Sequence, residues 1–162
     1  MGELVNSFGG LAIALFGMSL AVGLACIGSA KGTGAAGEAA SGICAEDPAK
    51  FGKAMILQVL PGTQGLYGLV AWFIAALNIG LLGGGLTELT LMQGWQIFFA
   101  CLPAAFGLLI SAIYQGRVAA SAMHILAKKP DDFAKGIMLC IVVEFYAILS
   151  LLGTILMLVG LN

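Results

Sequence analysis

Long stretches without charge dominate the pattern of hydrophobic and polar positions along the chain. Four of them cover residues 4–30, 54–87, 89–116 and 136–162, and the last contains one acid, Glu144. Crossing about 30 Å of hydrocarbon takes about 20 helical residues at about 1.5 Å each, so each stretch is long enough for one transmembrane helix. A membrane β-barrel has alternating segments of about ten residues instead. The pattern predicts an all-α membrane protein with four transmembrane helices.

The composition agrees with this prediction and excludes other classes. Of the 162 residues, 60% are hydrophobic and 9% are charged, and the mean hydropathy is +1.06. A soluble domain has about 25% charged residues, and a disordered chain is far less hydrophobic. A net charge of −1 does not provide the clustered basic surface that binds nucleic acid, so we expect no such partner. The first three residues lack the basic region of a signal peptide, so we expect the first helix to be retained.

The basic residues indicate an orientation in the membrane. All seven Lys and Arg residues lie in or beside two connections, which are centred on Pro48 and Pro130. The termini and the remaining connection carry Glu3 and Glu88 and no basic residue. Since cytoplasmic loops are enriched in Lys and Arg, we expect a multi-pass protein of the cell membrane. The two proline loops would lie in the cytoplasm and both termini outside.

The second half of the chain repeats the first at an offset of 82 residues. We therefore expect two helical hairpins, residues 1–80 and 81–162. Each unit crosses the membrane twice, so both copies point the same way, unlike the inverted repeats of many secondary transporters. The identical pairs are Ser29/Ser111, Ala30/Ala112, Gly34/Gly116, Ile43/Ile125, Ala45/Ala127, Pro48/Pro130, Phe51/Phe133, Lys53/Lys135 and Leu57/Leu139.

The first predicted helix carries a stripe of small residues, spaced by threes and fours. Helices in a bilayer associate by close backbone packing, which small residues permit. One interpretation is ordinary packing inside a four-helix bundle. Because the stripe is about 44 Å long at helical rise, we favour an extended seam against identical neighbouring chains. The stripe consists of Gly10, Ala14, Gly17, Ala21, Ala25, Gly28, Gly32, Ala35 and Ala39.

Glu144 is the acid inside the fourth stretch. It follows Lys135 by nine residues, which places it about 14 Å inside the membrane if that lysine marks the interface. A carboxylate near the bilayer centre costs at least about 2.5–3.5 kcal/mol, so such an acid is a functional-site hypothesis. The alternative is a permanently protonated packing residue.

Three more polar side chains lie at the depth of Glu144. Thr63 and Gln64 follow Pro48 by fifteen and sixteen residues, Glu144 follows Pro130 by fourteen, and Gln115 precedes Pro130 by fifteen. All four are therefore about 21–24 Å from their loop apex, which predicts a common site on three helices. Arg117 is only two residues from Gln115, so its side chain must reach water or mark a shallower interface.

Pro61 and Gly62 directly precede these polar residues. Pro61 has no amide hydrogen for the carbonyl of Leu57, and Gly62 allows the backbone to leave helical geometry. A carbonyl oxygen freed in this way needs a new partner, and a buried cation is one. The alternative is a kink that serves packing alone.

The candidate groups are hard oxygen donors: one carboxylate, two amides, one hydroxyl and a backbone carbonyl. They suit Na⁺ better than a proton, because a proton needs only the carboxylate. Mg²⁺ and Ca²⁺ usually recruit more carboxylates than one. Tyr67, one turn beyond Thr63, is placed to donate its hydroxyl to Glu144.

These features together resemble the membrane rotor subunit of V-type rotary ATPases, and more narrowly the bacterial sodium-transporting K subunit, a c-type proteolipid. The resemblance rests on the duplicated hairpin, on residues 61–68 (PGTQGLYG), on Gln115-Gly116 and on Val143-Glu144. It implies a Na⁺ site whose ligands are the Leu60 carbonyl and the side chains of Thr63, Gln64, Gln115 and Glu144, with Tyr67 bonded to the glutamate.

The resemblance also implies an assembly. Many copies would form a ring with the first and third helices inside, so that Glu144 faces the outer rim. The implied partners are the lipid bilayer, a stator a-type subunit with an essential arginine, and a central-stalk subunit on the cytoplasmic face. The transported ion would be Na⁺, with no organic cofactor. The chain has no P-loop and no nucleophile arrangement, so we expect it not to be catalytic alone and ATP to be hydrolysed by other subunits.

Three alternatives remain at this stage. The first is a proton-translocating version of the same rotor subunit. The second is a stand-alone cation channel or small transporter. The third is a purely structural ring or pore whose buried glutamate never titrates.

Overall fold

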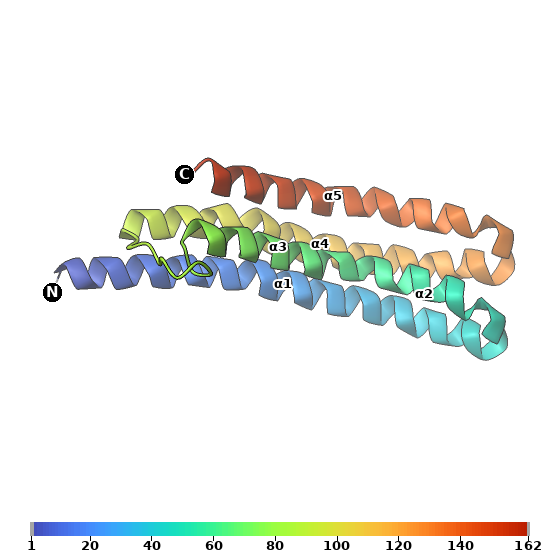
Figure 1. Cartoon of the computed structure of the whole chain (residues 1–162). Helices are drawn as coiled ribbons and strands as arrows, with labels where there is room; N and C mark the ends of the chain where they lie inside the picture. Colours follow the sequence, from blue (N-terminus) through green and yellow to red (C-terminus); the bar gives the residue numbers. More distant parts are fainter. Residues whose placement is uncertain (1, 162) are drawn as a thin grey trace.

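Four helical segments form one bundle in the computed structural model, which describes residues 2–161 of the chain and the side chains from residue 9 onward (Figure 1). The first, third and fourth segments contain single long helices, and a short 3₁₀ turn at Leu60–Gly62 divides the second. All four are long and apolar enough to cross a membrane, which confirms the predicted number of spans. The helices are α1 (Gly2–Glu46), α2 (Phe51–Val59), α3 (Thr63–Asn78), α4 (Leu91–Lys128) and α5 (Phe133–Val159).

The helices extend beyond the charge-free stretches on the side of the proline loops. α1 continues sixteen residues past Ala30, and α4 continues eleven past Arg117. Arg117 is exposed, and its guanidinium lies 5.1 Å from the centroid of the Tyr114 ring. The guanidinium therefore lies on the surface of the single chain, and α4 continues well beyond it.

Both hairpins turn at their prolines. The turns Pro48–Lys50 and Pro130–Asp132 are short 3₁₀ segments, and Asp47 accepts a hydrogen bond from the amide of Ala49 at 3.1 Å. Figure 1 shows these two turns at one end of the bundle, and both chain ends at the other together with the connection of residues 79–90. The predicted boundary between residues 80 and 81 lies in that connection, where Gly80 and Gly84 have positive φ angles.

The small-residue stripe of α1 packs against α4 of the same chain. A Cβ atom added at Gly116 would lie 2.3 Å from the Cα of Gly32, and one at Gly94 would lie 2.7 Å from the Cα of Gly10. The expectation that this stripe contacts identical neighbours is therefore wrong for these residues. The physical reason is that α4 carries its own glycines at matching heights, so two bare helical faces approach each other within one chain.

Candidate ion-binding site

The site begins where the second span changes from α2 to α3. Because Pro61 cannot donate a backbone hydrogen bond, the chain forms the 3₁₀ turn at Leu60–Gly62, and the amide of Thr63 donates to the carbonyl of Leu60. The Thr63 hydroxyl oxygen lies 2.9 Å from the same carbonyl oxygen. Thr63 and Tyr67 then lie one helical turn apart on the same face of α3. The Leu60 carbonyl is thereby held beside the side chains that start α3.

Glu144 lies in the middle of α5, where 9% of its surface is exposed, and it receives hydrogen bonds from two neighbouring helices. Its Oε1 accepts from the hydroxyl of Thr63 at 2.8 Å and from that of Tyr67 at 2.6 Å. Its Oε2 accepts from Nε2 of Gln115, on α4, at 2.6 Å. The structure thus brings together polar residues that are separated by up to 81 positions in the sequence.

The two glutamines connect to each other behind Glu144. Both are fully buried, and Gln64 Nε2 donates to Gln115 Oε1 at 2.6 Å. Gln115 Nε2 also donates to the carbonyl of Cys140 at 3.1 Å. A half-turn of the Gln115 amide would present its oxygen instead of its nitrogen on the side of the carboxylate. The predicted site side chains therefore form one hydrogen-bonded group, which consists of Thr63, Gln64, Tyr67, Gln115 and Glu144.

Two serines near the site were not among the predicted residues. Ser111, on α4, accepts weakly from Gln64 Nε2 at 3.5 Å and donates to the carbonyl of Val143 at 3.1 Å. Ser29, on α1, accepts from the amide of Gly65 at 2.8 Å. The two serines are an identical pair at the repeat offset of 82, so they lie at the same distance from their proline turns. This repeated polar position was the feature of the sequence that could have indicated them.

Neutral groups alone surround the buried carboxylate. Within residues 2–161, the two ion pairs are Asp47–Lys50 and Asp132–Lys135, and both lie at the proline turns. No three His, Cys, Asp or Glu side chains gather into a metal cluster in that same part of the chain. A carboxylate in a low-dielectric site without a basic partner needs a proton or a cation to become neutral. The arrangement can therefore take up one positive charge, as a proton or as a cation.

Comparison with known proteins identifies the family. The family model that describes the C subunit of ATP synthase matches residues 16–75 and 98–157, which together are well over half of the chain. The chain belongs to this ATP synthase C-subunit family. Since the two matches begin 82 positions apart, at residues 16 and 98, they confirm the duplicated hairpin.

Two relatives show which members of the C-subunit family the chain is similar to. The chain is 46% identical over 150 residues to the V-type sodium ATPase subunit K of Enterococcus hirae, covering 93% of this chain and 92% of that relative. It is 39% identical over 150 residues to the A-type ATP synthase subunit K of Methanocaldococcus jannaschii, and there it spans 63% of the relative's length. As a member of the C-subunit family, the chain is a multi-pass membrane component of a rotary ATPase, and its family forms the rotor rings of such complexes.

Proposed function

We propose that this chain is a rotor-ring subunit of a V-type ATPase and carries Na⁺ across the membrane while partner subunits hydrolyse ATP. The observation that carries the proposal is Glu144, a buried carboxylate that three hydrogen-bond donors hold and that pairs with no basic residue of the described chain. The name of the Enterococcus hirae relative, which the chain matches over nearly its full length, supports Na⁺ as the ion.

The proposed ligands are the Leu60 carbonyl, the Thr63 hydroxyl, the amide oxygens of Gln64 and Gln115, and the Glu144 carboxylate. These hard oxygen donors fit Na⁺, and a single carboxylate balances its charge. Their close grouping supports this set, since Thr63 contacts both the Leu60 carbonyl and Glu144, and Gln115 contacts both Gln64 and Glu144. Pro61 and Gly62 form the turn that presents the Leu60 carbonyl.

Tyr67 holds Glu144 in place when the site is loaded. Its hydroxyl donates to Oε1 of Glu144 at 2.6 Å, and the ring is half-buried between α3 and α5. A hydroxyl donor leaves the negative charge of the carboxylate available to the ion, whereas a basic side chain would compete with the ion for it. The tyrosine therefore orients the carboxylate without neutralising it.

The charge of Glu144 couples ion binding to rotation. A site that holds Na⁺ is neutral and can face lipid, whereas a bare carboxylate cannot, so ions are exchanged only at the stator. There an arginine of the a-type stator subunit pairs transiently with Glu144 and displaces the ion. Each ion that crosses at 100 mV exchanges about 2.3 kcal/mol with the membrane potential. One carboxylate per four helices passes few ions per turn, which suits pumping against steep gradients.

The rest of the proposed assembly follows from the same arrangement. The proline turns lie in the cytoplasm, where they meet the central stalk, and both chain termini lie outside. The concentration of basic residues near the turns supports this orientation. The subunit is not catalytic alone and uses no organic cofactor, because its chemistry is the binding and release of one ion.

Labelling with a hydrophobic carbodiimide tests the proposal, since this reagent modifies protonated carboxyl groups in membranes. The purified oligomer should be labelled at Glu144, added Na⁺ should slow the reaction, and Glu144→Gln should abolish it. Labelling that Na⁺ does not slow would assign the rotor to protons instead. Absence of labelling would favour a purely structural ring, and Na⁺ conduction by the reconstituted chain alone would favour a channel.

A further inference from the structure

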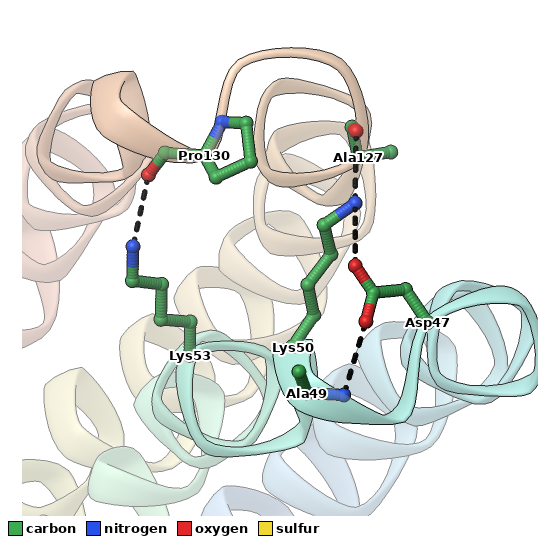
Figure 2. Close-up of polar contacts among 6 residues, drawn as sticks. All are labelled: Asp47, Ala49, Lys50, Lys53, Ala127 and Pro130. Atoms are coloured by element: carbon green, nitrogen blue, oxygen red, sulfur yellow. Dashed lines mark hydrogen bonds and ion pairs between the residues drawn. The ribbon is translucent and has the colours of Figure 1, made fainter.

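A lysine connects the two hairpins at their proline turns. Lys53, on α2, donates from Nζ to the carbonyl of Pro130 at 3.1 Å, as Figure 2 shows. The same Nζ lies 5.9 Å from the centroid of the Phe133 ring. A second lysine, Lys50, donates to the carbonyl of Ala127 at 3.1 Å (Figure 2). The turn of the first hairpin is thereby joined to the turn of the second.

The three residues of the Lys53 contact have identical counterparts in the other hairpin, for which the structure gives no such contact. At the repeat offset of 82, its three residues correspond to Lys135, Pro48 and Phe51, and all three are the same residue types. Yet 71% of the Lys135 side chain is exposed, and it lies 2.8 Å from Asp132 in a surface pair of a kind that contributes little. Phe51 is 59% exposed, whereas Phe133 is half-buried. The chain therefore carries both halves of a second such contact on different surfaces.

The same asymmetry continues along the helices. Leu57 and Gln64 are fully buried where the first hairpin meets the second, but their counterparts Leu139 and Tyr146 are 53% and 65% exposed. On the opposite surface, Ala112 is fully buried against α1, and its counterpart Ala30 is exposed. Two surfaces that are complementary inside the chain are thus repeated on its outside, which is the arrangement of a head-to-tail interface between identical subunits.

We infer that neighbouring copies of this chain join by repeating the hairpin interface, so that Lys135 of one copy donates to the Pro48 carbonyl of the next copy and lies over its Phe51 ring. This inference rests on the rotor ring proposed above. It gives Lys135 a defined acceptor and covers an aromatic ring that the single chain leaves exposed. Glu46, an exposed acid two residues before Pro48, favours the approach of a lysine.

The second lysine contact is not repeated between copies. The counterpart of Lys50 is Asp132, and the counterpart of Ala127 is Ala45. A carboxylate cannot donate a hydrogen bond to a carbonyl at the end of a helix, and its charge is unfavourable there. Two lysines therefore join the turns within a chain, and Lys135 alone joins the turns between chains.

Paired cysteines test this contact in the full-length oligomer. Because both residues meet through long side chains, a short bifunctional thiol reagent is used rather than direct oxidation. With it, Lys135→Cys with Phe51→Cys should give a ladder of covalent multimers, whereas Lys53→Cys with Phe133→Cys should close within one chain. Single cysteine variants control for the native thiols. If the inner pair closes and the outer pair forms no ladder in an intact oligomer, the contact is refuted while the rotor ring stands. A monomeric chain would overturn both.

Dissociation kinetics supply a second measurement without new cysteines. Lys135→Gln should speed the dissociation of the oligomer in detergent by roughly two- to fivefold, the size expected for an exposed cation–π contact. Phe51→Leu added to Lys135→Gln should cause little further change, because both remove the same contact. Lys129→Gln, an exposed lysine of the same turn, should leave the rate unchanged. A parental rate for Lys135→Gln would refute the contact.

Discussion

Replacing Gln115 by leucine tests the ligand set most directly. Gln115 is fully buried between α4 and α5, and leucine has a similar volume, so the change removes polar atoms with little change in packing. Three hydrogen bonds are lost: to Glu144 Oε2 at 2.6 Å, to the Cys140 carbonyl at 3.1 Å, and from Gln64 Nε2 at 2.6 Å. In the proposed loaded site, one of five ligand oxygens is lost.

The expected magnitude follows from the charge of the partner. A hydrogen bond or ligand that acts on a charged group contributes about 1.5–3 kcal/mol. At about 1.4 kcal/mol per factor of ten, the dissociation constant for Na⁺ should rise roughly ten- to hundredfold. Gln64 Nε2 keeps only its long 3.5 Å contact with Ser111 Oγ, so the variant should also lose some thermal stability.

Equilibrium binding of labelled Na⁺ to the purified oligomer is the assay. Gln58→Leu is the matched control, because Gln58 is a half-buried glutamine of α2 whose side-chain amide lies against Gly37, away from Glu144. It should bind Na⁺ like the parent chain. Should Gln115→Leu assemble normally and bind Na⁺ within twofold of the parent, the proposed ligand set would be wrong.

Two further changes have expected outcomes. Tyr67→Phe removes the 2.6 Å donor to Glu144 and should weaken Na⁺ binding roughly two- to tenfold in the same assay. An unchanged affinity would show that Tyr67 does not hold Glu144 in the loaded site. Gly116→Ala places a Cβ 2.3 Å from the Cα of Gly32 and should lower stability by about 1–3 kcal/mol in thermal unfolding, whereas Gly34→Ala enters open space and should not.

Much of the site could be predicted by counting residues from the two prolines. The hairpins repeat, so Pro48 and Pro130 lie at the same height, and an α-helix advances by a constant rise per residue. That regularity is why Thr63, Gln64 and Gln115 could be assigned to the depth of Glu144 without coordinates. Their mutual contacts could not be assigned in this way, because depth along a helix does not determine which neighbour a side chain faces.

The sequence by itself determined the number of spans, the repeat and the position of Glu144 along the fourth span. The reason is that hydrocarbon excludes charged groups, so the runs between them record where the chain crosses the membrane.

The tertiary structure alone decided which faces meet. It paired the small residues of α1 with the glycines of α4 in the same chain, brought Ser111 and the Cys140 carbonyl to the glutamines, and left Lys135 and Phe51 exposed. These outcomes depend on the rotation of each helix about its axis. Lipid is equally apolar on every side of a helix, so it does not favour one rotation over another. In a membrane the rotation is therefore set by close backbone contact between helices.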